Sequence, residues 1–325
     1  MSSREHLVRA LWTLFEPVHA LTYFSPQSRD SFAAAGLTRY WDGYFAGRAA
    51  PLGAISGAPV TAIFSGFAPA LVERALPAVW STLTPERALE ARAEGAVATI
   101  RALAPDESIV ARAAEALLPA ALAVGAHAVG RPLAAANHAL LAALVTPDPY
   151  RVLWQCVTTL REHRGDGHVL ALVTEDMAGL STIVLRAGLD LDAPHMQRAR
   201  GWTDDEWHAE QRSLVARGLL APAASRTDAG TSPATAPHAA TPLGEAALAR
   251  AEQLTNTLAV GPWQLFDDNA LRAIAAALYP VAAACAPLFP YPNPIGMPHS
   301  WNPTTDPDAT AVPSAPERGA ARTAA

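Results

Sequence analysis

Eight consecutive residues, Arg161–His168, form the densest group of chemically active side chains in the chain. Their sequence, REHRGDGH, combines two guanidinium groups, two imidazoles and two carboxyl groups with two glycines. The pattern predicts a helix that ends near His163, a break at Gly-Asp-Gly, and a second helix that begins at His168. Such a break would aim the polar side chains at one small volume, which makes this segment the first candidate for a binding or reaction site.

The residue types in this segment suit the handling of an anionic ligand. Arg161 or Arg164 could hold the anionic group. His163 or His168 could move a proton, because an unperturbed imidazole has a pKa of about 6.5. Glu162 and Asp166 complete the expected catalytic set. Either carboxylate could orient an imidazole and raise its basicity.

The same segment also permits a structural interpretation. Asp166 could be the N-cap of the second helix, Gly165 or Gly167 could end the first helix, and the arginines could tie helices together. We favour a functional site, because helix caps alone do not require two histidines and two arginines.

A second group of interest is Glu16-Pro-Val-His19, which places a carboxylate and an imidazole on one face of a helix. Helices present metal ligands in this way, and the histidines at 163 and 168 could complete a four-ligand site. However, Pro17 lies between the two residues, and the pattern arises often by chance. We therefore predict no metal, and we expect Glu16 and His19 in ligand-binding or core hydrogen bonds.

Tyr44 and Arg48 share one helix face in an aromatic stretch whose other members are expected in the core. An internal duplication pairs Tyr40–Gly53 with Leu153–His168, since each segment has a tryptophan followed seven residues later by an arginine. The duplication makes Arg48 the counterpart of Arg161. If the two copies pack about a pseudo-twofold axis, both arginines face a shared cleft, so Tyr44 and Arg48 join the predicted ligand-binding residues.

Hydrophobic residues recur at helical spacing over nearly the whole chain, which predicts a mainly α-helical fold. The first helix is expected to end at Ser25-Pro26, and a second helix is expected to run from Pro26 to Gly36. Later helices are expected at 38–48, 57–64, 67–79, 85–103, 108–124, 132–144, 149–163, 168–175, 179–187, 203–217, 243–259 and 267–284.

Composition indicates a folded, soluble protein. Of the 325 residues 50% are apolar and 17% are charged, all 24 basic residues are arginine, and the net charge is −6. This balance disfavours DNA as a partner, although a local basic patch could still bind it. The sequence contains no uninterrupted run of about 18 apolar residues, so we expect no membrane span. An N-terminus without a signal-peptide pattern, and two cysteines in apolar helical patterns (Cys156 and Cys285), predict a cytoplasmic location.

Several short sequence motifs make the chain resemble an actinobacterial family of helix-turn-helix or winged-helix-like proteins. The resemblance covers roughly residues 6–300. It rests on EPVH at 16–19, YFAGRAAPLG at 44–53, GRPL at 130–133, LREHRGDGH at 160–168, GWT at 201–203 and PNPIG at 292–296. The resemblance implies a fold and names no reaction.

The second half of the chain ends like a winged-helix domain, with an expected helix, the sequence RGLL, a loop, and a helix that opens at Thr241. We expect two degenerate winged-helix-like lobes, one at 1–130 and one at 131–300. A wing insert at 222–240, rich in Pro, Ala, Thr and Ser, and a tail at 301–325 are expected to be disordered.

These observations favour a protein that binds a small polar or anionic metabolite in the cleft between the lobes. It could be an enzyme of specialised metabolism that uses histidine and arginine for acid–base chemistry. No phosphate-binding glycine loop, nucleophile elbow or HExxH motif is present, so any cofactor is unknown.

Two alternatives stay open. The first is a winged-helix transcriptional regulator that binds DNA and a small effector. Against it, the helix expected to read DNA opens with Asp204, Asp205 and Glu206, which would repel phosphate. The second is an interaction protein in which the helix breaks are structural. The sequence gives no indication of the number of subunits in the protein.

Overall fold

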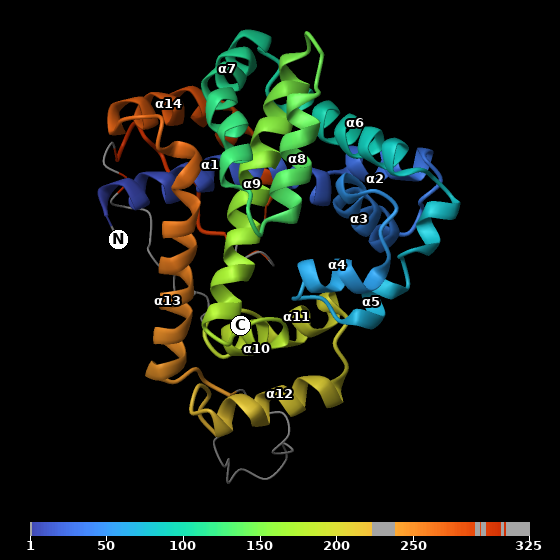
Figure 1. Cartoon of the computed structure of the whole chain (residues 1–325), viewed down its shortest axis with the longest axis vertical. Coiled ribbons are helices and arrows are strands. Elements are labelled where there is room, and N and C mark those ends of the chain that lie inside the picture. The colour runs from blue at the N-terminus through green and yellow to red at the C-terminus, as the bar shows by residue number, and fades with distance from the viewer. Residues whose placement is uncertain (1, 223–237, 290–292, 294–296, 307–308, 310–325) are drawn as a thin grey trace, which may run out of the picture.

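Helices form almost all of the regular structure in the computed structural model of the chain (Figure 1). The structure describes residues 2–222, 238–289, 293, 297–306 and 309. Within these ranges it has fourteen α-helices, several short 3-10 turns and no strand. The prediction of a mainly α-helical fold is confirmed. The described residues form three hydrophobic cores, and two long helices, α9 (Pro149–Thr174) and α13 (Pro242–Ala259), extend from the first core to the third.

The largest core lies in a bundle built from α1 (Ser3–Phe24), α6 (Pro85–Leu103), α7 (Glu107–Ala123), α9 and α14 (Asp268–Cys285). A capping box begins α1, in which the Ser2 hydroxyl accepts from the backbone N–H of Glu5. Leu11 and Leu14 of α1 are fully buried in the bundle. Since the burial of each such side chain stabilises the fold by about 1.5–3 kcal/mol, α1 is held firmly in the bundle.

Two apolar segments of this bundle, Glu107–His127 and Asp268–Leu288, are long enough to cross a membrane by length and composition alone. Both contribute side chains to the core, among them Leu117 and Leu278. Core helices of soluble proteins meet the same criterion, so the location of the protein in the cell stays a prediction.

A second core forms around α2 (Pro26–Ala34), α3 (Tyr40–Ala49), α4 (Gly57–Ile63), α5 (Pro69–Glu73) and one side of α6. The ring of Phe32 lies so close to Gly43 and Gly47 that a Cβ atom at these glycines would be 2.9 and 2.7 Å from it. The two glycines therefore allow α2 to pack directly on α3. The last turn of α3 carries Arg48 toward α9.

The third core belongs to four helices at the far end of α9: α10 (Leu180–Ala187), α11 (Ala193–Arg200), α12 (Asp204–Ala216) and α13 (Figure 1). Three residues join α11 to α12. Gly201 has a φ angle of +77°, and Thr203 begins α12 with a capping box. After α12, Leu220 and Ala240 pair as an isolated antiparallel bridge. Most of the predicted wing insert and of the predicted tail lies outside the described residues.

The turn between α11 and α12 lies against the N-terminal half of the chain. A Cβ atom at Gly201 would be 2.8 Å from Cβ of Leu71 on α5. The indole N–H of Trp202 donates to the carbonyl of Gly66 at 3.1 Å. We call α10, α11 and α12, with the turns between them, the helix-turn-helix. Together with α9 and the segment that follows α4, the helix-turn-helix encloses a common space.

The predicted helix break at Gly165–Gly167 is wrong, because α9 is uninterrupted across these residues. Gly167 permits a close approach instead. The guanidinium of Arg131 donates to the carbonyl of His163 at 2.7 Å, and a Cβ atom at 167 would lie 2.9 Å from the same nitrogen. The structural alternative of a cap within this segment is also wrong, since its residues are all in the helix interior.

Two further differences concern short helices. α11 was not expected, because Met196 is its only buried residue and its sequence shows no apolar period. The range 67–79, expected as one helix, holds α5 and the start of a separate 3-10 turn, Ala78–Ser81, since Pro77 interrupts it. The domain boundaries and the internal duplication stay predictions.

Candidate ligand-binding site

Two adjoining cavities lie along α9, where the helix-turn-helix meets the rest of the protein. The larger cavity, of about 240 Å³, lies between α9, α10, α11 and residues 63–67. The smaller cavity, of about 150 Å³, lies between α1, α9, α10 and α13; we call it the arginine cavity. Among the described residues, those that line both cavities are Arg161, Gly165, His168 and Arg186.

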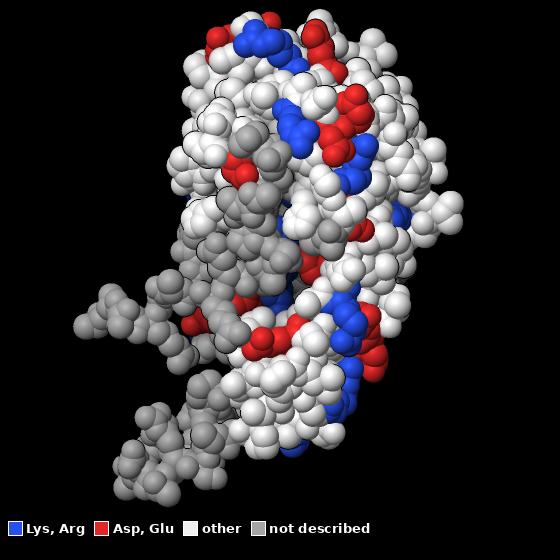
Figure 2. Space-filling view, turned by 90° about the vertical axis from the view of Figure 1, so that its left-hand side faces the viewer, with Lys and Arg blue, Asp and Glu red and all other residues white. Residues whose placement is uncertain are grey.

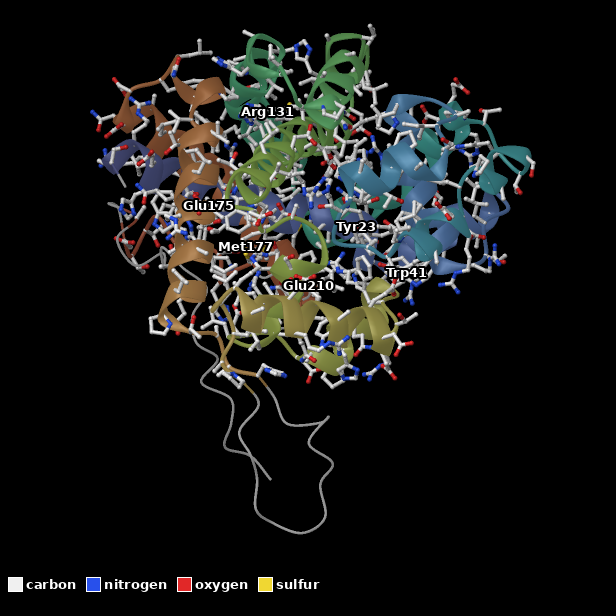
Figure 3. The ribbon with its side chains drawn as sticks, turned by 60° about the horizontal axis from the view of Figure 1, so that its bottom comes forward. Tyr23, Trp41, Arg131, Glu175, Met177 and Glu210 are labelled. Atoms are coloured by element: carbon white, nitrogen blue, oxygen red, sulfur yellow. The ribbon has the colours of Figure 1, made fainter. Side chains whose placement is uncertain are left out.

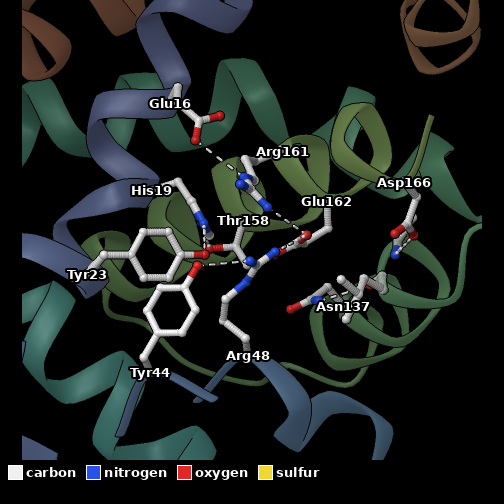
Figure 4. Close-up of polar contacts among 12 residues, drawn as sticks. Glu16, His19, Tyr23, Tyr44, Arg48, Asn137, Thr158, Arg161, Glu162 and Asp166 are labelled. Carbon is white, nitrogen blue, oxygen red and sulfur yellow. Dashed lines mark hydrogen bonds and ion pairs between the residues drawn. The ribbon is translucent and has the colours of Figure 1, made fainter. Parts of the chain in front are cut away.

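A chain of ion pairs covers the side of α9 that faces α1 and α3 (Figure 4). Arg161 is its centre, with Nε 3.3 Å from the carboxylate of Glu16 and Nη1 2.9 Å from that of Glu162. Glu162 also lies 3.6 Å from Arg48, which donates to the hydroxyl of Tyr44 at 3.1 Å. Two arginines and two carboxylates thus balance, as buried charges require. The structure brings five of the predicted site residues together here.

A second ion-pair group is short of negative charge. One oxygen of Glu252 accepts from Nε of Arg9 at 2.9 Å and from Nη2 of Arg164 at 2.8 Å. Although burial raises the pKa of Glu252, the charges of Arg164 and Arg9 hold that pKa below its usual value. One carboxylate therefore serves two buried guanidinium groups, and Nη1 of each has no hydrogen-bond partner among the described residues.

His168 lies where the two cavities adjoin, with Nδ1 2.9 Å from the hydroxyl of Thr255. Burial lowers the pKa of His168 to about 4, so the imidazole is neutral at pH 7. A neutral imidazole can exchange a proton with a ligand without adding another positive charge. Of the predicted acid–base residues, His168 lines both cavities, whereas Glu162 and Asp166 line the larger one.

His163 lines neither cavity. Burial lowers its pKa to about 3, and its Nε2 has no hydrogen-bond partner among the described residues. Residues five positions apart on a continuous helix point about 140° apart. His163 and His168 therefore cannot face one volume, which removes the geometry on which their paired role was predicted.

Asp166 caps a neighbouring helix. Its carboxylate accepts from the backbone N–H of Ala134 at 3.0 Å, in the first turn of α8 (Pro132–Ala142). Arg131, the N-cap residue of α8, makes no side-chain cap, so Asp166 takes this role from α9. Burial raises the pKa of Asp166 to about 7, so the group is partly protonated at neutral pH. No hydrogen bond from Asp166 to an imidazole is found in the described part of the chain.

His19 is buried beside the ion-pair chain and lines neither cavity. Its Nε2 lies 2.8 Å from the hydroxyl of Tyr23, and its Nδ1 lies 3.1 Å from that of Thr158 (Figure 4). Burial lowers the pKa of His19 well below its usual value. The sequence predicted either ligand binding or core hydrogen bonds for His19. The structure shows the side chain in core hydrogen bonds. Within the described ranges, no group of three or more His, Cys, Asp or Glu side chains could hold a metal ion.

Sequence reasoning missed several charged residues of the cavities, namely Arg9, Arg186, Arg200 and Glu252. Arg186 pairs at 2.6 Å with Asp190, which lies just after the end of α10, and the guanidinium of Arg200 lies 4.3 Å from the ring centre of Phe67. Arg9 could have been found, because it precedes Glu16 by two helical turns on α1. Nothing in the sequence places α10, α11 or α13 beside α9.

The helix-turn-helix presents an acidic edge to solvent where α12 begins. Asp204, Asp205 and Glu206 are all exposed in its first turn. Glu210 lies further along α12 (Figure 3). Its carboxylate accepts from the hydroxyl of Ser181 on α10 at 2.7 Å. On the face drawn in Figure 2, arginine and acidic side chains alternate. The acidic start of α12 is unlike the basic surface that DNA-binding proteins present.

The fold thus places a helix-turn-helix beside two cavities, one of which is lined by four arginines. A family model described as a helix-turn-helix family matches residues 8–289, and the chain belongs to this family. No match to the chain was found among curated proteins or among solved structures. The prediction of a helix-turn-helix family is confirmed, whereas its actinobacterial origin and its winged-helix character stay predictions.

Proposed function

We propose that the protein binds a small anionic metabolite in the arginine cavity. The observation that carries this proposal is the imbalance of buried charge. Among the described residues, the cavity is lined by four arginines (Arg9, Arg161, Arg164 and Arg186) and by two carboxylates (Glu16 and Glu252). An unpaired buried charge costs several kcal/mol. A bound anion would remove that cost.

Partners outside the cavity reduce the imbalance without removing it. Asp190 pairs with Arg186, and Glu162 is shared between Arg161 and Arg48. Counting these residues, five arginines face four carboxylates in the described part of the chain. The excess is one positive charge, which a monoanionic ligand would neutralise. If the ligand is also a substrate, His168 is the group placed to exchange a proton with it.

A thermal-shift titration tests the proposal. Inorganic phosphate and acetate are the probes, with sodium chloride adjusted to keep the ionic strength constant. Both anions are expected to raise the Tm of the wild type, because a ligand that binds only the folded state stabilises it. Arg164→Gln should reduce the rise. Arg101→Gln is the matched control, since Arg101 pairs with Asp148 at the surface. A rise no larger than that given by chloride, or one unaffected by Arg164→Gln, would contradict the proposal.

A second function, transcriptional regulation, is supported by the family and by the bridge between Leu220 and Ala240, which flanks the predicted wing insert. The acidic first turn of α12 opposes it, because phosphate contacts supply most DNA affinity. An electrophoretic shift of genomic fragments at low salt, weakening as salt rises, would support this function. No shift at low salt would contradict it.

A further inference from the structure

We infer that the anion is amphipathic, with its charged head among the arginines and its apolar body in the larger cavity beside the helix-turn-helix. This inference rests on the proposed function and adds the chemical class of the ligand. It would belong to the small acids that carry a hydrocarbon or aromatic body, with a carboxylate or a phosphate as head group.

The two cavities adjoin at a position without a side chain. Gly165 lines both, and a Cβ atom built there would have its nearest contacts at 3.4 Å, to Nη1 of Arg161, and at 3.7 Å, to the carboxylate of Glu162. Arg161, His168 and Arg186 line both cavities beside it. A head group bound by these residues would therefore lie at the entrance to the larger cavity.

The larger cavity is suited to an apolar group. Its lining includes Phe64, Phe67, Leu133, Val169, Ile183 and Met196. Its charged members already have partners of their own. Arg48 pairs with Glu162, Asp166 caps α8, and Arg200 stacks on a phenyl ring. An apolar body can therefore fill this space without displacing an ion pair.

The ligand would also contact the helix-turn-helix directly. Ile183 and Arg186 come from α10, and Met196 comes from α11. One molecule would thus contact α9 of the bundle and two helices of the helix-turn-helix at once. A head group alone would contact only Arg186 from this region.

Isothermal titration calorimetry of the full chain tests the inference with acetate, hexanoate, hexanamide and hexyl phosphate. Each buried methylene is expected to tighten binding by roughly fourfold, so hexanoate should bind at least tenfold more tightly than acetate. Hexanamide, which lacks the charge, should bind at least tenfold more weakly than hexanoate. Comparison of hexanoate with hexyl phosphate then identifies the preferred head group, and either preference supports the inference.

A pair of variants locates the apolar body. Val169→Phe fills part of the larger cavity and should reduce the affinity for hexanoate to that for acetate, leaving acetate itself unchanged. Val173→Phe, one turn further along α9, is the matched control, because Val173 is 58% exposed and lines neither cavity. The chain-length comparison on the wild type needs no variant and stands even if Val169→Phe fails to fold.

Each outcome decides between the two proposals. Equal affinities for acetate and hexanoate would overturn the amphipathic class and leave the anion site intact. Equal affinities for hexanoate and hexanamide would overturn the role of the charged head. No binding of any of the anions to the wild type would overturn both the inference and the proposed function.

Discussion

The guanidinium of Arg131 lies against the backbone of α9 at Gly167, 2.9 Å from where a Cβ atom would be. From this position Arg131 donates to the carbonyl of His163 at 2.7 Å and to that of Leu258 at 3.0 Å. One side chain thereby joins the start of α8 to α9 and to α13. The glycine is required for this approach and does not interrupt the helix.

A pair of glycine substitutions tests this relationship. Gly165→Ala should stabilise the protein by about 0.5–1 kcal/mol, because alanine is favoured over glycine inside a helix and its nearest contact would be 3.4 Å. Gly167→Ala should destabilise it, because Arg131 must give up hydrogen bonds worth about 1.5–3 kcal/mol each for a charged donor. Urea unfolding of both variants gives the two free energies. Stabilisation by both substitutions would show that Arg131 does not hold this position.

The sequence predicted the helices well because apolar periodicity is a local signal, and α1, α6 and α13 follow it closely. The error at REHRGDGH arose because glycine and aspartate disfavour helices locally, whereas packing of Arg131 and capping by Asp166 favour a continuous α9. The charge around Arg161 was found from sequence. The partners of Arg164 were not, because Arg9 and Glu252 lie far from it in the chain.

Asp166 should make stability depend on pH between about 4 and 7. Its pKa is about 7 in the folded protein and 3.8 without burial, so the folded state binds more protons than the unfolded state in this range. The stability contributed by Asp166 is present below pH 3.8 and is lost as pH rises through 7. The side chain of Asp166→Asn cannot ionise. The free energy of unfolding of this variant, relative to that of the wild type, should therefore be higher at pH 8 than at pH 4 by about 2–4 kcal/mol. Urea unfolding at the two pH values measures this difference, and an equal gain at both would contradict the assignment.

His168 should act in the opposite direction. Burial lowers its pKa from 6.5 to about 4, so the unfolded state binds more protons between these values. The stability it contributes is present above pH 6.5 and is lost as pH falls through 4. When the pH is lowered from 7 to 4.5, the free energy of unfolding of the wild type should fall further than that of His168→Gln, by about 2–3 kcal/mol. His195→Gln, at an exposed position of α11, is the control and should follow the wild type. Identical pH profiles for all three proteins would contradict the burial of His168.

Glu252 should be the carboxylate on which the arginine cavity depends most. Glu252→Gln leaves Arg9 and Arg164 without a counter-charge and should destabilise the protein by about 3–5 kcal/mol. Added phosphate should restore part of this loss, because it can occupy the vacated charge position. Glu94→Gln, which removes an exposed partner of Arg87, should cost at most about 1 kcal/mol. A loss at Glu252 as small as the loss at Glu94 would show that the buried charges are not coupled.

Native mass spectrometry of the full chain tests the central claim most directly. The wild type, Arg164→Gln and Arg101→Gln would each be measured before and after incubation with a mixture of phosphate, succinate, acetate and hexanoate. A binding site in the arginine cavity predicts a single bound acid in the wild type and in Arg101→Gln, and its loss in Arg164→Gln. The ligand-free mass in all three proteins, or the same bound acid in all three, would contradict a ligand site in the arginine cavity.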